Sequence, residues 1–253
     1  MTIQYCSDLH LEFPENKYFL EKNPLIPTGD ILILAGDIVP FARMKSFDYF
    51  FDFVSNNFQF TYWIPGNHEY YYCDASKKTG ILFEEIKKNV FLVNNVAVIH
   101  KNWRLIFSTL WSKISSGAEW DIEKAMNDFK VIRFGEKRFS TRVYNQLHKD
   151  SISFIAKEIS KPFVGKTVVA THHVPTFLNY PTQFKLSILN GAFATELFDL
   201  IDASSIDYWI YGHHHVNTLE FKINKTKLVS NQLGYIRYNE QQGFERNKTL
   251  VFT

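Results

Sequence analysis

The chain has 253 residues, a length that one large α/β domain can account for. With 45% hydrophobic and 21% charged residues, its composition is that of a folded globule and excludes a disordered or fibrous protein. Lys and Arg number 28 and Asp and Glu 26, with no long run of either sign, which argues against nucleic acid as a partner. No Pro/Gly/Ser linker interrupts the chain, so we expect a single domain over residues 1–253.

Cysteine content and hydropathy predict where the protein resides. Cys6 and Cys73 are the two cysteines, and Cys6 lies inside an apolar run where a buried thiol is expected. No charged-then-apolar leader is present, and no apolar stretch approaches 18 residues. These features predict a cytoplasmic protein without a membrane span.

Five short apolar runs have the length of buried strands. They cover residues 3–6, 31–35, 60–64, 167–170 and 208–211. Hydrophobic residues three and four positions apart predict helices around 47–58, 143–155 and 193–201. Asn94-Asn95 and Asn224-Lys225 predict turns of hairpins within 90–98 and 219–229, with 103–110 as a further strand. This mixture of elements predicts an α/β protein with two sheets.

Each of the five apolar runs stops at a polar cluster. In chain order the clusters are Asp8-Leu9-His10, Gly36-Asp37, Gly66-Asn67-His68-Glu69, Thr171-His172-His173 and Gly212-His213-His214-His215. In open α/β sheets ligands bind beyond the carboxyl ends of the strands, so the clusters are expected to meet in one crevice. They contain seven of the nine histidines.

Imidazole combined with carboxylate and amide oxygen, without thiolate, is an environment for manganese, iron or zinc. The seven candidate ligands are Asp8, His10, Asp37, Asn67, His172, His213 and His215. That number is too large for one ion, but it suits two adjacent ions if Asp37 bridges them together with a water or hydroxide. Two ions about 3.5 to 4 Å apart are the arrangement that promotes in-line displacement at phosphorus.

The ordered motifs Asp-x-His, Gly-Asp, Gly-Asn-His-Glu, a lone His and Gly-His-x-His resemble those of the calcineurin-like metallophosphoesterases. Segments 126–129 and 231–235 resemble a bacterial branch of that family. The resemblance implies a four-layer α-β-β-α sandwich of two mixed sheets flanked by helices. It also implies two divalent ions, with Mn²⁺ expected first and Fe or Zn as alternatives.

Residue roles follow from the same resemblance. Asp8, His10 and His215 would hold the first ion, and Asn67, His172 and His213 the second. Asp37 would bridge the two ions, and the catalytic residue His68 would contact the phosphoryl group and protonate the leaving oxygen. The protein Ser/Thr phosphatases continue Gly-Asp with Asp-Arg, which this chain lacks, so a protein phosphatase is disfavoured.

We therefore expect a phosphatase or phosphodiesterase acting on a small phosphoester such as a nucleotide, with the choice between mono- and diester left open. The alternative is a non-catalytic metal-binding scaffold or interaction module of the same fold, but all eight motif positions are retained. Glu69 is expected to accept backbone N–H bonds and hold its loop. Phe177 and Tyr180, in the loop 174–190, are predicted to border the cleft and contact the organic part of the substrate. The roles of His173, His214, Trp111 and Asp128 stay open.

Overall fold

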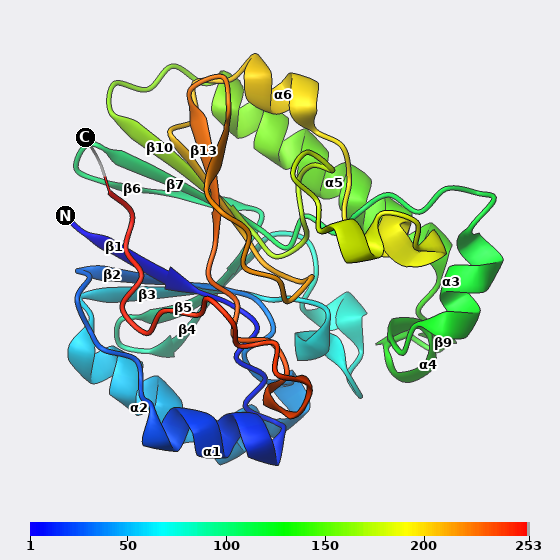
Figure 1. Cartoon of the computed structure of the whole chain (residues 1–253), viewed down its shortest axis with the longest axis horizontal. Coiled ribbons are helices and arrows are strands. Elements are labelled where there is room, and N and C mark those ends of the chain that lie inside the picture. Colours follow the sequence, from blue (N-terminus) through cyan, green and yellow to red (C-terminus); the bar gives the residue numbers. More distant parts are fainter. Residues whose placement is uncertain (252–253) are drawn as a thin grey trace.

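Two mixed β-sheets lie face to face, and helices cover the outer face of each (Figure 1). This computed structural model describes residues 1–251. The layers follow the order helix, sheet, sheet, helix, which confirms the predicted four-layer α-β-β-α architecture.

The first sheet has five strands in the order β1-β2-β3-β5-β4. Its parallel strands are β1 (Ile3–Cys6), β2 (Ile31–Ala35), β3 (Phe60–Ile64) and β5 (Val90–Asn94), and β4 (Leu82–Lys87) pairs antiparallel at the edge. Side chains alternate across this sheet, as the pleat requires. Leu32 and Leu34 pack toward the helices, whereas Ile31 and Ile33 pack between the two sheets.

The second sheet has six strands in the order β12-β13-β11-β10-β7-β6. They are β12 (Phe221–Ile223), β13 (Thr226–Ser230), β11 (Tyr208–Tyr211), β10 (Lys166–Thr171), β7 (Trp103–Ser108) and β6 (Val96–His100). The four central strands are parallel and both edge strands are antiparallel. A separate two-stranded ribbon joins β8 (Arg133–Phe134) to β9 (Lys137–Arg138).

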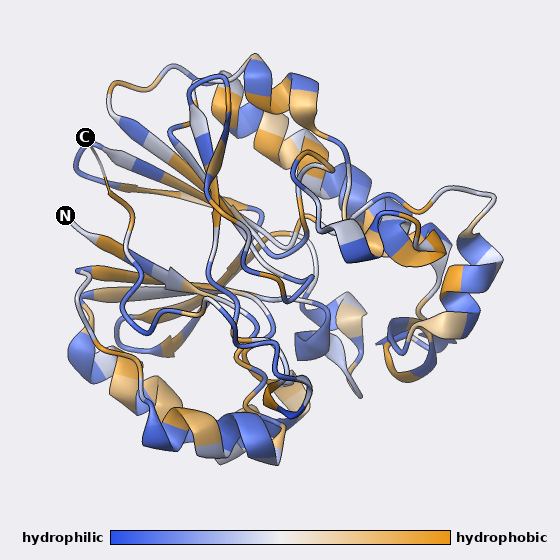
Figure 2. Ribbon diagram, viewed as in Figure 1, coloured by the Kyte–Doolittle hydropathy of each residue, from blue (hydrophilic) through white to orange (hydrophobic). Residues whose placement is uncertain are grey.

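The helices bury one face each. On the first sheet lie α1 (Pro14–Lys22) and α2 (Asp48–Asn57), on the second α5 (Thr141–Ser160) and α6 (Phe198–Asp202), and at one end of the sandwich α3 (Glu119–Ala125) and α4 (Asp128–Val131) (Figure 1). Short 3₁₀ turns occur at Phe41–Phe47, His68–Tyr70, Ala75–Lys77, Thr182–Phe184, Ile188–Ala192 and Ile236–Tyr238. Hydrophobic residues alternate with hydrophilic ones along the covering helices (Figure 2), the pattern of a helix with one buried face.

The five predicted strands and the helices of 47–58 and 143–155 are confirmed. The predicted hairpin of 90–98 is wrong, because β5 belongs to the first sheet and β6 to the second. The side chain of Asn94 accepts the Thr109 N–H at 2.7 Å, and that of Asn95, where φ is 49°, accepts the Ser108 hydroxyl at 2.7 Å. The Asn pair therefore directs the chain from one sheet to the other. The hairpin of 219–229 is confirmed as β12 and β13.

The helix predicted over 193–201 is shorter than expected, since α6 begins at Phe198. Ala194 forms a bridge with Val174, which keeps the preceding segment extended. The carboxylate of Glu196 then accepts the N–H groups of Phe177 and Phe198, at 3.1 and 3.0 Å. Pairing across the loop thus overrides the local hydrophobic pattern.

Within residues 1–251, none of the helices is long and apolar enough to cross a membrane.

Candidate metal centre

The seven candidate ligands lie at the carboxyl ends of five parallel strands, three from the first sheet and two from the second. β1 is followed by Asp8 and His10, and β2 and β3 by Asp37 and Asn67. β10 is followed by His172, and β11 by His213 and His215. The two sheets therefore bring residues far apart in sequence to one edge of the sandwich, as predicted.

The backbone at these positions is unusual. Five of the seven candidates have left-handed φ angles: Asp8 (56°), His10 (47°), Asp37 (54°), His213 (79°) and His215 (56°). Such conformations cost about 1 to 3 kcal/mol each in a residue with a side chain, and they cluster at functional sites. Here neighbouring loops hold them, since the Asp8 and His10 N–H groups donate to the carbonyls of Gly36 and Asp37, both at 2.9 Å.

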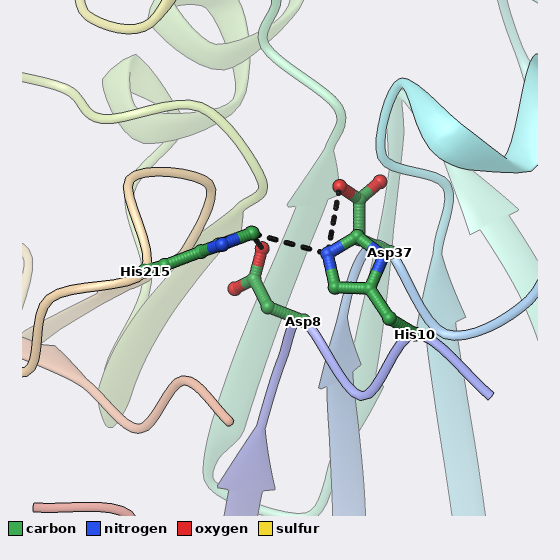
Figure 3. Close-up of side chains that lie close together, drawn as sticks. All are labelled: Asp8, His10, Asp37 and His215. Atoms are coloured by element: carbon green, nitrogen blue, oxygen red, sulfur yellow. Dashed lines mark hydrogen bonds and ion pairs between the residues drawn. The ribbon is translucent and has the colours of Figure 1, made fainter. Parts of the chain in front are cut away.

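The first ligand group is formed by Asp8, His10, Asp37 and His215, whose candidate ligand atoms all lie within 4.8 Å of one another. His10 Nε2 is 3.1 Å from His215 Nε2, and His215 Nε2 is 3.4 Å from Asp8 Oδ1. Figure 3 shows Asp8 and His10 on the loop after β1, with the ring of His215 approaching them from the facing loop.

The second group is formed by Asp37, Asn67, His172 and His213. His172 Nε2 lies 3.2 Å from Asn67 Oδ1 and 3.0 Å from His213 Nδ1. Asp37 belongs to both groups, because its Oδ2 is 3.7 Å from His10 Nε2 and 3.5 Å from His172 Nε2. Its Oδ1 accepts the His68 N–H at 2.9 Å, which fixes the carboxylate with Oδ2 between the two groups.

Hydrogen bonds at the outer edge of the first group show that a cation fits between its rings. His10 Nδ1 lies 3.2 Å from the Glu12 carboxylate and His215 Nδ1 lies 2.6 Å from that of Glu240. Carboxylates accept hydrogen bonds, so in the neutral rings each Nδ1 carries the proton and each Nε2 presents a lone pair. Two lone pairs 3.1 Å apart attract a shared positive charge, which a proton supplies in the metal-free protein and a metal ion can supply in its place.

The second group has the same property. His172 Nδ1 lies 3.0 Å from the carbonyl of Ala35, and His213 Nε2 lies 3.2 Å from that of Ala192. The facing atoms, His172 Nε2 and His213 Nδ1, are therefore both lone-pair donors in the neutral rings. The donor set thus fits two ions that share one carboxylate.

The electrostatic field at the centre is negative and favours cations. Burial lowers the pKa of His172, but the carboxylates of Asp37 and Asp8 outweigh it and raise that pKa to about 9. For His215, burial is likewise outweighed by Asp8 and Glu240, and its pKa rises to about 10. Without metal, protons take up the negative charge that an ion would otherwise balance.

His68 lies beside the first group and lines the cleft above it. Its Nδ1 is 3.1 Å from Glu12 Oε1, its Nε2 is 3.2 Å from the Tyr235 hydroxyl, and the Tyr71 ring stacks on it at 4.1 Å. Burial lowers the pKa of His68, but the carboxylates of Asp37 and Glu12 outweigh it and raise the pKa above its ordinary value. The ring is therefore held in one orientation and stabilised in its protonated form.

Sequence reasoning missed Glu12, Glu240 and Tyr235. Glu12 Oε1 contacts the Nδ1 atoms of both His10 and His68, and its side chain is only 8% exposed. Its position two residues after His10 was a weak signal that an acceptor follows the motif. Glu240 lies 25 residues beyond His215, and nothing in the local pattern marks it.

The open role of Asp128 is clear from its contacts. Its Oδ1 accepts hydrogen bonds from the Asn67 side-chain amide at 3.0 Å and from the Tyr71 hydroxyl at 2.8 Å. Asp128 therefore turns the carbonyl oxygen of Asn67 toward His172 and holds the ring that stacks on His68. His173 packs 4.3 Å from the ring of the candidate ligand His213, and Trp111 packs 5.3 Å from His173.

The expectation for Glu69 is confirmed. Its Oε2 accepts the N–H groups of Asp37 and Gly66 at 2.9 and 2.6 Å, and its Oε1 accepts those of Ile38 and the Trp63 indole at 2.6 and 3.1 Å. One fully buried carboxylate thus joins the Gly-Asp and Gly-Asn-His-Glu loops.

Replacement Glu69→Gln tests this role through stability. Two buried N–H donors would face an amide NH₂ group, and each unsatisfied donor costs about 1 to 3 kcal/mol. We expect the free energy of unfolding of the metal-free protein in urea to fall by about 2 to 6 kcal/mol. Glu15→Gln, at an exposed position of α1, is the matched control. A loss below about 1 kcal/mol would show that these bonds contribute little.

A cleft of about 650 Å³ opens above the two groups. Its aromatic lining consists of Phe13, Tyr71, Tyr72, Phe184, Phe193 and Tyr235. Phe177 and Tyr180, predicted to border the cleft, do not line it: Phe177 is half-exposed, and Tyr180 lines a smaller adjoining cavity. From the same loop, Phe184 and the following Phe193 reach the cleft instead.

Comparison with known proteins places the chain in a family. A sequence model of the Calcineurin-like phosphoesterase family matches residues 1–217. The chain is 31% identical to an uncharacterized protein of Acanthamoeba polyphaga mimivirus, over 92% of this chain and 91% of that protein. The chain therefore belongs to the calcineurin-like phosphoesterase family, which confirms the resemblance seen in the motifs. It is a metal-dependent phosphoester hydrolase, and the family implies a dimetal centre.

Two solved structures are similar to this chain. Phosphopantetheinyl hydrolase from Mycobacterium tuberculosis has a TM-score of 0.73 and 16% identity, over 99% of this chain and 95% of that one. It shows that the two chains share a fold. A dimetal phosphatase from Danio rerio is more distant, with a TM-score of 0.47 and 10% identity over 92% of this chain and 87% of that one.

Proposed function

We propose that the chain hydrolyses small phosphoesters with two divalent ions, Mn²⁺ in the first instance, bound at the two ligand groups. Asp8, His10 and His215 hold one ion, Asn67, His172 and His213 hold the other, and Asp37 bridges them. The observation that carries this proposal is the convergence of lone pairs: His10 faces His215, and His172 faces His213, at 3.1 and 3.0 Å.

The bound ions would supply an activated water and neutralise charge on the phosphoryl oxygens. The chain's own residues supply the rest. His68 donates a proton from Nε2 to the leaving oxygen, because its Nδ1 is committed to Glu12, whereas its Nε2 faces the Tyr235 hydroxyl, and both His68 and Tyr235 line the cleft. Glu12 holds the ring in place and supports its positive charge, the role of a buried carboxylate behind a catalytic imidazole. Asp128 fixes Asn67, so the second ligand group is organised before substrate arrives.

The shape of the cleft favours a small substrate with an organic group. Its volume of about 650 Å³ is within the range of small-molecule sites. Among the described residues that line the cleft, Arg43 is the one Lys or Arg. The cleft therefore lacks the basic stripe that a nucleic-acid backbone requires. The aromatic walls suit a nucleotide or a similar ester. The phosphopantetheinyl group, named for the mycobacterial hydrolase, is a second candidate for a substrate panel.

Metal-dependent hydrolysis of chromogenic esters tests the proposal. We expect protein reconstituted with Mn²⁺ to release nitrophenolate from p-nitrophenyl phosphate or from bis(p-nitrophenyl) phosphate, and a chelator to abolish the reaction. The ester that reacts faster decides between monoesterase and diesterase. The control is Asp8→Asn, which removes a ligand of the first group and should lower the rate with both esters. A rate that is the same with and without metal would contradict the proposal.

Contact of Phe177 and Tyr180 with the substrate stays a prediction. Replacement of both by Ala is expected to raise the Michaelis constant of an aromatic ester more than that of a small aliphatic ester. Equal changes for both esters, or a collapse of thermal stability, would assign these side chains to packing instead.

A further inference from the structure

A second cavity adjoins the cleft. This side pocket has a volume of about 170 Å³ and is lined by Tyr180, Phe184, Leu189, Phe193 and His214, with two polar residues of the same loop. Phe184, Phe193 and His214 also line the cleft, so the two cavities share a wall. The Phe193 ring stacks on His213 at 4.5 Å, which places the side pocket directly beside the second ligand group.

The walls of the side pocket suit an aromatic ring. Three of them are aromatic, and an apolar cavity of about 150 Å³ is large enough for a benzene molecule. Tyr180 is buried and its ring meets the Phe177 ring at 5.3 Å and the Phe184 ring at 6.4 Å. Phe177 therefore supports the pocket from behind, although it does not line it.

His214 contributes one polar group whose chemistry the surrounding bonds determine. Its Nδ1 lies 3.2 Å from the backbone N–H of Val216 and 3.1 Å from the side-chain amide of Gln232. The Gln232 amide is itself fixed, since its oxygen accepts the His215 N–H at 2.8 Å and its nitrogen donates to the Val216 carbonyl at 3.0 Å. Two donors therefore point at Nδ1, which must be an acceptor, and the ring proton lies on Nε2.

The Nε2–H group of His214 has no hydrogen-bond partner among the described residues, and it is not sealed from solvent. Because the Nδ1 edge of the ring faces Gln232, the opposite edge is the one that borders the cavities. A donor without a protein partner beside an apolar pocket favours ligands that bring an acceptor, and the preference is modest where water can also reach the donor.

We propose that the side pocket binds the organic group of the substrate, and that this group is an aromatic ring of about pyrimidine size with a hydrogen-bond acceptor for the His214 Nε2–H. The inference rests on the proposed function, because the phosphoryl group must occupy the metal centre. Phe184 and Phe193, which line both cavities, contact the bound ring in the side pocket. His214 selects rings that carry a carbonyl or a ring nitrogen.

Three phosphonates, which the enzyme cannot hydrolyse, test the pocket by calorimetric titration of Mn²⁺-reconstituted protein. They are ethylphosphonate, 2-phenylethylphosphonate and 2-(3-pyridyl)ethylphosphonate. We expect the phenyl ring to tighten binding about tenfold relative to ethyl, and the pyridyl nitrogen to tighten it about fivefold more. If ethylphosphonate itself does not bind, the proposed function fails. If all three bind equally, the metal site stands and the side-pocket proposal is overturned.

Two variants distinguish loss of the His214 Nε2–H donor from loss of the hydrogen bonds that His214 Nδ1 makes to the fold. In His214→Asn the amide oxygen can replace Nδ1 as the acceptor for Val216 and Gln232, but the Nε2–H is lost. In His214→Gln the terminal amide can take the position of Nε2 and still donate. We expect the pyridyl advantage to vanish in the Asn variant and to survive in the Gln variant, while the phenyl advantage persists in both. The reverse order would overturn the role of Nε2–H.

A third variant, Leu189→Trp, fills the side pocket and should abolish the phenyl advantage. The matched control is Leu186→Ala, a fully exposed position of the same loop that lines neither cavity, and it should keep the affinity ratios of the three phosphonates.

A phosphonate analogue of phosphopantetheine serves as the competing ligand. If it binds more tightly than the pyridyl compound and loses this advantage in Leu189→Trp, the pocket takes an aliphatic amide arm and the aromatic proposal is wrong.

Discussion

We expect His68→Ala to retain two metal ions per chain and to hydrolyse its substrate about a hundredfold to ten-thousandfold more slowly, the loss typical of a missing general acid. The physical reason is the position of the ring. Its Nδ1 lies 3.1 Å from Glu12 Oε1 and its Nε2 lies 3.2 Å from the Tyr235 hydroxyl, so both nitrogens have partners outside the two ligand groups. The measurement is turnover with a series of aryl and alkyl esters, together with metal analysis of the same samples.

The leaving group distinguishes proton donation from a structural role. Nitrophenolate departs without protonation, so the defect should be small for nitrophenyl esters and large for alkyl esters. His100→Ala is the matched control, because His100 at the end of β6 bonds to Tyr62 of β3, away from the centre. If His68→Ala is purified without metal, His68 is a ligand and the assigned role is wrong.

Asp37→Asn should empty both metal sites and lower activity more than a hundredfold, beyond the tenfold to hundredfold loss seen when a supporting residue is removed. The amide oxygen would still accept the His68 N–H, and the amide nitrogen would replace Oδ2, the atom that faces both His10 and His172. An amide NH₂ group has no lone pair available for a metal, so both ions lose a ligand at once.

Asp8→Asn is the comparison that makes this result specific. Asp8 offers a ligand atom to the first group alone, and an Asn at this position can still accept the His213 N–H, so the replacement should weaken one ion and leave the other bound. If Asp37→Asn loses only one ion, or if both variants lose the same single ion, the shared carboxylate is not a bridge.

Much of the centre could be predicted because it is encoded in short segments. A buried strand is recognisable from a run such as Ile31 to Ala35, and the polar residues that follow it must lie at the carboxyl edge of the sheet. Asp37 and His172 were found in this way. Glu69 was also predictable, since a carboxylate three residues after Gly66 can reach the backbone N–H groups of its own loop.

The residues behind the ligands could not be predicted, because they reach the centre only through tertiary packing. Glu240 contacts His215 from the turn that follows the 3₁₀ segment Ile236–Tyr238, and Tyr235 approaches His68 across 167 positions of sequence. A Glu or Tyr in a polar loop is ordinarily exposed, and the neighbouring sequence does not indicate that it contacts a distant histidine. The same limit explains the wrong hairpin at Asn94 and Asn95, where bonds to the following strand decide the direction of the chain.

The most direct test of the account is the number of metal ions bound by the unaltered chain. Protein reconstituted with Mn²⁺ and freed of loosely bound metal should contain two equivalents per chain by elemental analysis. That result is expected because seven ligands converge in two groups that share Asp37. A plateau at one equivalent under metal excess would contradict the two-ion centre on which the proposed function depends.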